Sequence, residues 1–222
     1  MRFYLQFWVI LMLSFSSFAQ YFGEDRFGVT VGATNYIMDT NFISSKSATG
    51  FLVGATSGIG LSDSFEVLVD MNLNYHRVKL LGRENETATP EDLNFNMQNL
   101  GLSTHIHYKF LEKEELTFGL NLGATGTIFY GYNTNHENES YLIDPLQIAV
   151  TYMNFDKWSD VGLLNAFVSF GLSAQYENFM ANLRYYKGVT NPYRHTPVYS
   201  PYVEFTGKDN YWSFTITYFF NN

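Results

Sequence analysis

The clearest pattern in the chain is a strict alternation of apolar and polar residues between Leu116 and Tyr132. The residues between the apolar ones are small or polar, and the apolar ones are Leu116, Phe118, Leu120, Leu122, Ala124, Ile128, Tyr130 and Tyr132. A period of two predicts a β-strand with one apolar and one polar face. The run exceeds the roughly 9–11 residues with which a tilted strand crosses a bilayer. Because its apolar face carries no charge, we expect that face to meet lipid.

The same alternation recurs along the chain, near residues 27–33, 51–61, 65–76, 100–110, 164–174, 179–185 and 212–220. Together these segments predict about eight strands, the smallest usual size of a bacterial outer-membrane barrel. Short turns at Ser62-Asp63, Glu112 to Glu115 and Glu177-Asn178 alternate with longer loops, which we place at residues 37–48, 79–93, 133–160 and 189–209. Short periplasmic turns and long extracellular loops are typical of such barrels. The sequence therefore predicts an all-β fold, a single antiparallel up-and-down transmembrane β-barrel.

The N-terminus has the pattern of a secretory signal peptide. Arg2 supplies a positive charge, Phe7 to Phe15 an apolar core, and Ser17-Phe18-Ala19 a cleavage signature of small residues. We assign residues 1–19 to a signal peptide and residues 20–222 to the barrel domain. The alternative is a transmembrane anchor, for which the apolar run is short.

Composition narrows the function classes. The 222 residues include 17 Tyr, 21 Phe and 17 Gly, and only 15% are charged. The net charge of −8 argues against a nucleic-acid partner, because such partners favour basic patches. The absence of Cys excludes disulfides, thiolate nucleophiles, thiolate metal sites and a lipid anchor on cysteine.

Charged side chains fall on the predicted inward face, at Glu66, Asp70, His105, His107, Lys109 and Arg184. Direct pairing of the third and fourth strands would place Glu66 near Lys109 and Asp70 near His105. Arg184, on the seventh strand, would face the third strand across an eight-stranded ring and could reach Asp70. An interior of this width is just filled by side chains. We therefore interpret these residues as a salt-bridged polar plug; a proton or ion path is the alternative.

Metal, nucleotide and catalytic sites have weaker support. His105 and His107 share a face but lack a third ligand, so we predict no metal. Residues 54–60, GATSGIG, resemble the nucleotide loop of short-chain dehydrogenases, but a turn and a further strand follow them instead of a helix. His76, His136 and His195 lie near the loop end, and nothing in the sequence pairs them with a serine and a carboxylate. We predict neither a cofactor nor an enzyme.

Several segments resemble the small outer-membrane β-barrel family of Bacteroidota, described as porin-family or PorT-like. They are Asn99 to Phe110, Leu116 to Tyr130, Asp160 to Leu163, Leu183 to Asn191 with its Arg-Tyr and Thr-Asn pairs, and Tyr211 to Phe220. The resemblance implies a location in the cell outer membrane and no particular substrate. PorT itself is an accessory of the type IX secretion system.

Two functions follow as hypotheses. The first is a structural or binding component that acts through its surface loops, with outer-membrane lipid and lipopolysaccharide around the barrel. Its protein partner would be bound by loop 133–160, which is rich in aromatic residues, within a secretion or gliding complex. The second is a narrow pore for ions or small solutes, which requires an open lumen.

Overall fold

The structure is a computed structural model that describes residues 26–41, 43–128, 131–133, 141–144, 164–193 and 206–220. Over these ranges the chain forms strands, turns and bends. No helix in the described ranges is long and apolar enough to cross a membrane. The predicted signal peptide, residues 1–19, lies outside the described residues.

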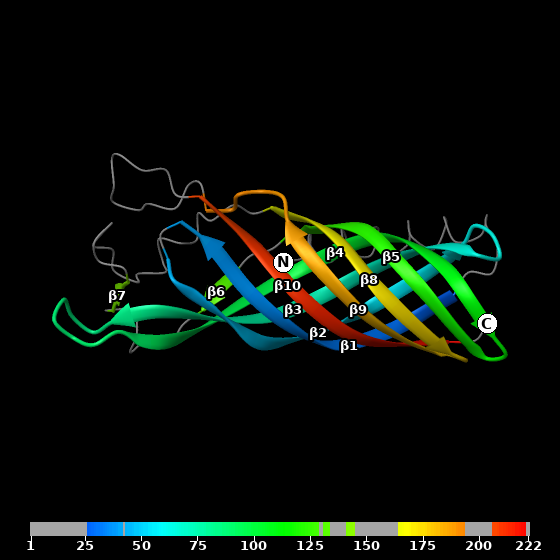
Figure 1. The fold of residues 1–222 in the computed structure, drawn as a ribbon, viewed down its shortest axis with the longest axis horizontal. Coiled ribbons are helices and arrows are strands. Elements are labelled where there is room, and N and C mark those ends of the chain that lie inside the picture. Colours follow the sequence, from blue (N-terminus) through cyan, green and yellow to red (C-terminus); the bar gives the residue numbers. More distant parts are fainter. Residues whose placement is uncertain are drawn as a thin grey trace, which may run out of the picture.

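Eight long antiparallel strands form the wall of a barrel. They are β1 Arg26–Thr40, β2 Ser45–Gly60, β3 Phe65–Arg83, β4 Glu91–Lys113, β5 Leu116–Thr127, β8 Asn165–Tyr176, β9 Phe179–Gly188 and β10 Gly207–Phe220. Each pairs with the next long strand, and β1 also pairs with β10, from Phe27 opposite Phe220 to Thr40 opposite Gly207. The last pairing closes the sheet, and Figure 1 shows the strands running obliquely around one axis. The predicted up-and-down barrel is confirmed.

The two ends of the barrel differ in their connections. Turns at residues 61–64, 114–115 and 177–178 join strands at one end, here called the turn end. Glu114 and Glu177 have φ angles of 54° and 48°, the left-handed backbone that tight hairpin turns require. The other end, the loop end, carries the connections at residues 41–44, 84–90, 128–164 and 189–206. The connections at 84–90, 128–164 and 189–206 are longer than the turns, as predicted, whereas the connection at 41–44 is no longer than the turn at 61–64.

The first two loops are shorter than predicted. β1 runs on to Thr40 and β2 begins at Ser45, so most of the predicted loop 37–48 is strand. Similarly, β3 continues to Arg83 and β4 begins at Glu91, which reduces the predicted loop 79–93 to residues 84–90. The strand predicted from Leu116 to Tyr132 is instead shorter than predicted, because β5 ends at Thr127.

Two short strands extend the sheet at the loop end. β6, Gly131–Asn133, pairs with β4 at Asn96 to Gln98, and β7, Leu142–Ile143, pairs with β3 at Gly82 and Arg83. The stretch from Leu116 to Tyr132 is therefore divided between β5 and β6.

The reason for the unexpected strand length is a reversal of the pattern along the strands. In the half nearer the turn end, apolar side chains point outward and polar ones inward: Leu120 is 46% exposed, whereas its neighbour Asn121 is 2% exposed. Toward the loop end the apolar side chains point inward, as Phe95 and Met97 do on β4, while Asn94 and Asn96 face outward. Outward apolar residues therefore predict each strand only as far as this reversal, and the rest of the strand is missed.

Candidate functional site

The outer face of the barrel is apolar between two rings of aromatic side chains. At the turn end, Phe65 packs against Tyr108 with ring centroids 4.8 Å apart, and at the loop end Phe51 packs against Tyr75 at 5.0 Å. From Phe65 to Tyr75 a strand rising about 3.3 Å per residue advances about 33 Å, which a tilt of about 40° reduces to about 25 Å. That distance is the height of the apolar band of an outer-membrane barrel.

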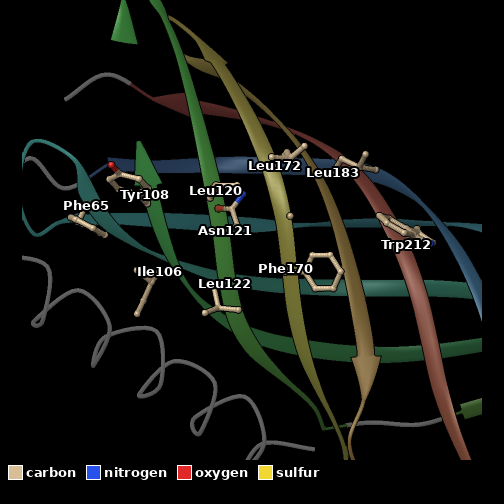
Figure 2. A pocket seen from close by; sticks show the side chains of 11 residues that line it. Phe65, Ile106, Tyr108, Leu120, Asn121, Leu122, Phe170, Leu172, Leu183 and Trp212 are labelled. Carbon is tan, nitrogen blue, oxygen red and sulfur yellow. The ribbon is translucent and has the colours of Figure 1, made fainter. Parts of the chain in front are cut away.

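Part of this face forms an open trough of about 630 Å³, whose lining side chains are shown in Figure 2. It extends from Ile106 on β4 across Leu122 on β5 to Trp212 on β10. Leu122 is 66% exposed and Ile106 is 54% exposed. Water-soluble proteins rarely expose large contiguous apolar surfaces. The outer face is therefore suited to contact lipid acyl chains.

The lumen, in contrast, is polar through the same band. Arg184 Nη1 on β9 donates a hydrogen bond to Asp70 Oδ2 on β3 at 2.7 Å. Asp70 also accepts one from Thr56 Oγ1 at 2.6 Å. Because β3 and β9 lie on opposite sides of the ring, the ion pair spans the lumen. Both charged side chains are almost fully buried.

A second group of bonds crosses the lumen nearer the turn end. Arg26, the first residue of β1, donates to Glu66 Oε1 at 2.5 Å and to Gln175 Oε1 at 2.7 Å. Glu66 Oε1 also lies 2.6 Å from His107 Nδ1, and His107 Nε2 lies 2.7 Å from Ser173 Oγ. These bonds connect β1, β3, β4 and β8, so side chains fill the lumen at this level as well.

Both β4 histidines lie between a serine and a carboxylate. Besides the Ser173–His107–Glu66 set, Ser169 Oγ lies 2.9 Å from His105 Nε2, and His105 Nδ1 lies 3.2 Å from an oxygen of Asp70. The order serine, histidine, carboxylate is that of a hydrolase triad, whose serine must reach its substrate. Here the two serines are 5% and 1% exposed. We therefore interpret both sets as contacts that hold the packed lumen together.

Glycines make room for these side chains. A Cβ on Gly119 would lie 1.9 Å from His107 Nε2 and 2.7 Å from Ser173 Oγ. A Cβ on Gly58 would lie 2.9 Å from the side chain of Arg26. Gly58 belongs to the GATSGIG stretch, which lies within β2 and pairs with β1 and β3. Gly54 and Gly58 lie against the side chains of Asn72 and Arg26, and this stretch opens no helix.

A layer of apolar side chains fills the lumen toward the loop end. Its members are at most 6% exposed, namely Tyr36, Met38, Ile43, Val78, Leu80, Leu93, Phe95, Met97, Phe167, Tyr186, Tyr193 and Tyr211. The hydroxyl of Tyr193 donates a hydrogen bond to Asp209 on β10. These packed side chains fill the lumen at this level as well. We call these residues the apolar layer.

The structure brings together some of the predicted lumen residues and separates others. Asp70 contacts both Arg184 and His105. Glu66 lies directly opposite His107 and is paired with Arg26, and Lys109 is the next inward residue along β4, so the predicted proximity of Glu66 to Lys109 holds to within one residue pair. Lys109 lies further toward the turn end of β4 and is half-buried.

Sequence reasoning missed several residues of the lumen, among them Arg26, Ser169 and Ser173. Arg26, like Thr30, occupies an inward position of β1, but it precedes the predicted start of that strand. Extending the alternation by one residue would have included it. Ser169 and Ser173 occupy inward positions of β8, but their histidine partners lie on β4, which is not adjacent to β8. Contacts between non-adjacent strands depend on the stagger of the barrel, which alternation does not specify.

His76, the remaining histidine in the described part of the chain, is packed among other side chains. His76 is buried between Tyr36 and Tyr211, with ring centroids 4.5 and 4.9 Å away, and its Nδ1 lies 3.0 Å from Thr34 Oγ1. Among the described residues, no three histidine, aspartate or glutamate side chains are grouped so as to hold a metal. His136 and His195 lie outside the described residues.

The hairpin of β3 and β4 extends beyond the other strands at the loop end (Figure 1). Its two strands pair from Phe65 opposite Tyr108 as far as Gly82 opposite Glu91. Arg83 Nε donates to Asp144 Oδ1 at 2.6 Å, next to the pairing of β7 with β3. Residues 142–144 of the predicted loop 133–160 are thereby attached to the hairpin, and the rest of that loop lies mostly outside the described residues.

No protein-family model matches the chain, and no curated protein sequence matches it significantly. Among solved structures, it is similar to Ail, the attachment invasion locus protein of Yersinia pestis, at 10% identity and a TM-score of 0.42, covering 89% of this chain and 100% of that chain. It is also similar to the outer membrane protein OprG from Pseudomonas aeruginosa, at 11% identity, a TM-score of 0.44 and coverages of 89% and 95%. Neisserial surface protein A follows at 14% identity, a TM-score of 0.40 and coverages of 87% and 97%. Similarity at this level supports no transfer of function.

Proposed function

We propose that this protein is an integral outer-membrane barrel with a closed lumen, which acts as a structural or binding component through its loop end. The observation that carries the proposal is the filling of the lumen at successive levels. The ion pair of Arg184 and Asp70 spans it, and the apolar layer fills it toward the loop end. The outer face of such a barrel contacts lipid, and its two ends contact water.

The binding surface that we propose is the projecting hairpin together with the segment attached to it. Outward side chains on this part of β4 are polar and exposed, as at Asp92 and Asn94. The contacts of residues 142–144 with β3 attach this part of loop 133–160 to the hairpin. Regularly paired strands keep such a surface in a fixed shape, which lowers the entropy cost of binding a partner.

The partner within this proposal is a secretion or gliding complex, for which the resemblance to PorT-like barrels of Bacteroidota is the support. Because the chain has no native cysteine, a cross-linker can be placed at a single position. Asn94→Cys on the hairpin should cross-link such a complex in intact membranes, and Asp63→Cys at the turn end is the matched control. Equal cross-linking from both positions would contradict a binding surface at the loop end.

We also propose that the protein is not an enzyme, although it contains serine–histidine–carboxylate sets. Ser173 is the more exposed of the two serines, and it is only 5% exposed. A fluorophosphonate probe should leave the folded barrel unlabelled. Labelling of the wild-type protein that Ser173→Ala abolishes would contradict this part of the proposal.

Single-channel recording in planar bilayers tests the closed lumen. Insertion is verified first, from the heat-induced gel shift of the folded barrel. The inserted wild-type protein should show no resolvable current, because charged side chains are bonded across the lumen and the apolar layer lies beyond them. Discrete, steady currents from the inserted protein would instead support a narrow pore.

A further inference from the structure

Three basic residues lie together on the outer face of β2 and β3. They lie just beyond the belt of aromatic side chains nearer the loop end. They are Lys46, Arg77 and Lys79, here called the basic patch. In the sheet register Lys46 lies directly opposite Lys79, and Arg77 lies opposite Ala48. Arg77 and Lys46 are exposed and Lys79 is half-buried.

The positive charge of the basic patch is only partly compensated. Lys46 Nζ donates to both oxygens of Asp92, at 2.8 and 2.9 Å. The guanidinium of Arg77 lies 5.6 Å from the ring centre of Tyr75. Neither Arg77 nor Lys79 forms an ion pair within the described residues. Like charges placed directly opposite on two strands are destabilising, so an anion bound between Lys46 and Lys79 would relieve this repulsion.

The height of the patch indicates where such an anion would come from. Arg77 is the next outward residue after Tyr75, whose ring packs on Phe51 at the loop-end edge of the apolar band. Side chains at this height meet lipid headgroups. Lys187 holds the equivalent place on β9, one outward step beyond Tyr185, which packs against Trp212.

The turn end has the opposite charge. Most exposed charged side chains there are acidic, namely Asp63, Glu112, Glu114, Glu115 and Glu177, whereas Lys113 is basic. The loop end also has exposed acidic side chains, at Asp39, Glu84, Glu86, Glu91 and Asp92, so the basic patch is a local concentration of positive charge on β2 and β3. A local group of basic side chains near the membrane surface attracts anionic headgroups in the leaflet that it borders.

We propose that the basic patch binds a phosphate group of a phosphorylated glycolipid in the outer leaflet, with the acyl chains lying on the apolar face below. The proposal rests on the proposed function, which places the loop end at the cell surface. Arg77 offers a planar fork of donors suited to a phosphate, and Lys46 and Lys79 offer point charges. Asn96 and Asn94, opposite Arg77 and Lys79 on β4, add amide donors at its edge.

The test uses the full-length barrel refolded in phosphatidylcholine vesicles that contain diphosphoryl lipid A, dephosphorylated lipid A or phosphatidylglycerol. Binding of each lipid is measured for the wild type, for Arg77→Gln/Lys79→Gln and for the matched control Lys113→Gln at the turn end. The double variant should bind diphosphoryl lipid A about 30-fold more weakly, which is about 2 kcal/mol at 1.4 kcal/mol per factor of ten. The control should bind it as the wild type does.

Three results would overturn the proposal. They are unchanged binding by the double variant, equal binding of dephosphorylated lipid A, which would show that acyl chains alone are recognised, and equal binding of phosphatidylglycerol, which would show that any anionic headgroup suffices. Failure of the wild-type protein to fold in any vesicle would contradict the proposed function itself, and this proposal with it.

Discussion

Replacing Arg184 with methionine should destabilise the barrel, because it leaves the carboxylate of Asp70 buried without its counter-charge. The two side chains are 3% and 2% exposed and are joined by a hydrogen bond of 2.7 Å. Breaking a buried ion pair by removing one partner costs about 3–5 kcal/mol. Asp70 would keep its hydrogen bond from Thr56, at 2.6 Å. We therefore expect a loss near the lower end of that range.

The double variant Arg184→Met/Asp70→Leu should be much less destabilised than the single one, because no unpaired charge remains in the lumen. Thr56 then loses one acceptor but keeps its contact with Thr30, whose Oγ1 lies 2.7 Å away. Free energies of unfolding come from urea titrations in lipid vesicles, followed by the heat-induced gel shift. Small and strictly additive effects of the two substitutions would refute a dry ion pair and indicate a hydrated lumen.

Three further predictions concern the lipid face, the packing of the lumen and the orientation. Leu120→Arg should cost about 2–4 kcal/mol of folding free energy in vesicles, whereas Leu116→Arg, near the edge of the same apolar face, should cost about 1 kcal/mol or less; equal costs would contradict the membrane placement. Gly119→Ala should cost about 1–3 kcal/mol in urea titrations, because its methyl group meets an imidazole that fills the space, while Gly126→Ala, whose Cβ meets nothing within 4 Å, should cost less than this. Protease added to intact cells should cut within residues 84–90, and fragments that end in the turns would show the reverse orientation.

Alternation was sufficient to predict the barrel, because each membrane-spanning strand must be apolar outside. On β5 every even-numbered residue from Leu116 to Ala124 points outward, as its side-chain pattern predicts. The same rule failed beyond the bilayer, where water lies outside the barrel and the apolar side chains turn inward. Met38 and Phe95 lie on such strand segments and point inward. The sequence pattern instead predicted a loop at Met38 and no strand at Phe95.

The candidate site could be predicted only in part. Counting strands around a ring suggests that Arg184 faces Asp70, and the structure places them together. The partner of Glu66 depends on the register between β3 and β4, which are joined by the loop at 84–90. The predicted register differs from the observed one by one inward position, and it therefore places Lys109 opposite Glu66 where the structure has His107.

Labelling of single cysteines tests the central claim, a lipid-facing wall around a closed lumen, most directly. The chain contains no cysteine, so each introduced thiol is the sole target. In vesicles, Leu120→Cys should react only with a membrane-permeant, lipid-soluble maleimide, and Asn94→Cys on the hairpin should react with a water-soluble one. Asn121→Cys, at a position 2% exposed in the lumen, should react with neither. Rapid reaction of Asn121→Cys with the water-soluble reagent would contradict the closed lumen, and rapid reaction of Leu120→Cys with it would contradict the lipid-facing wall.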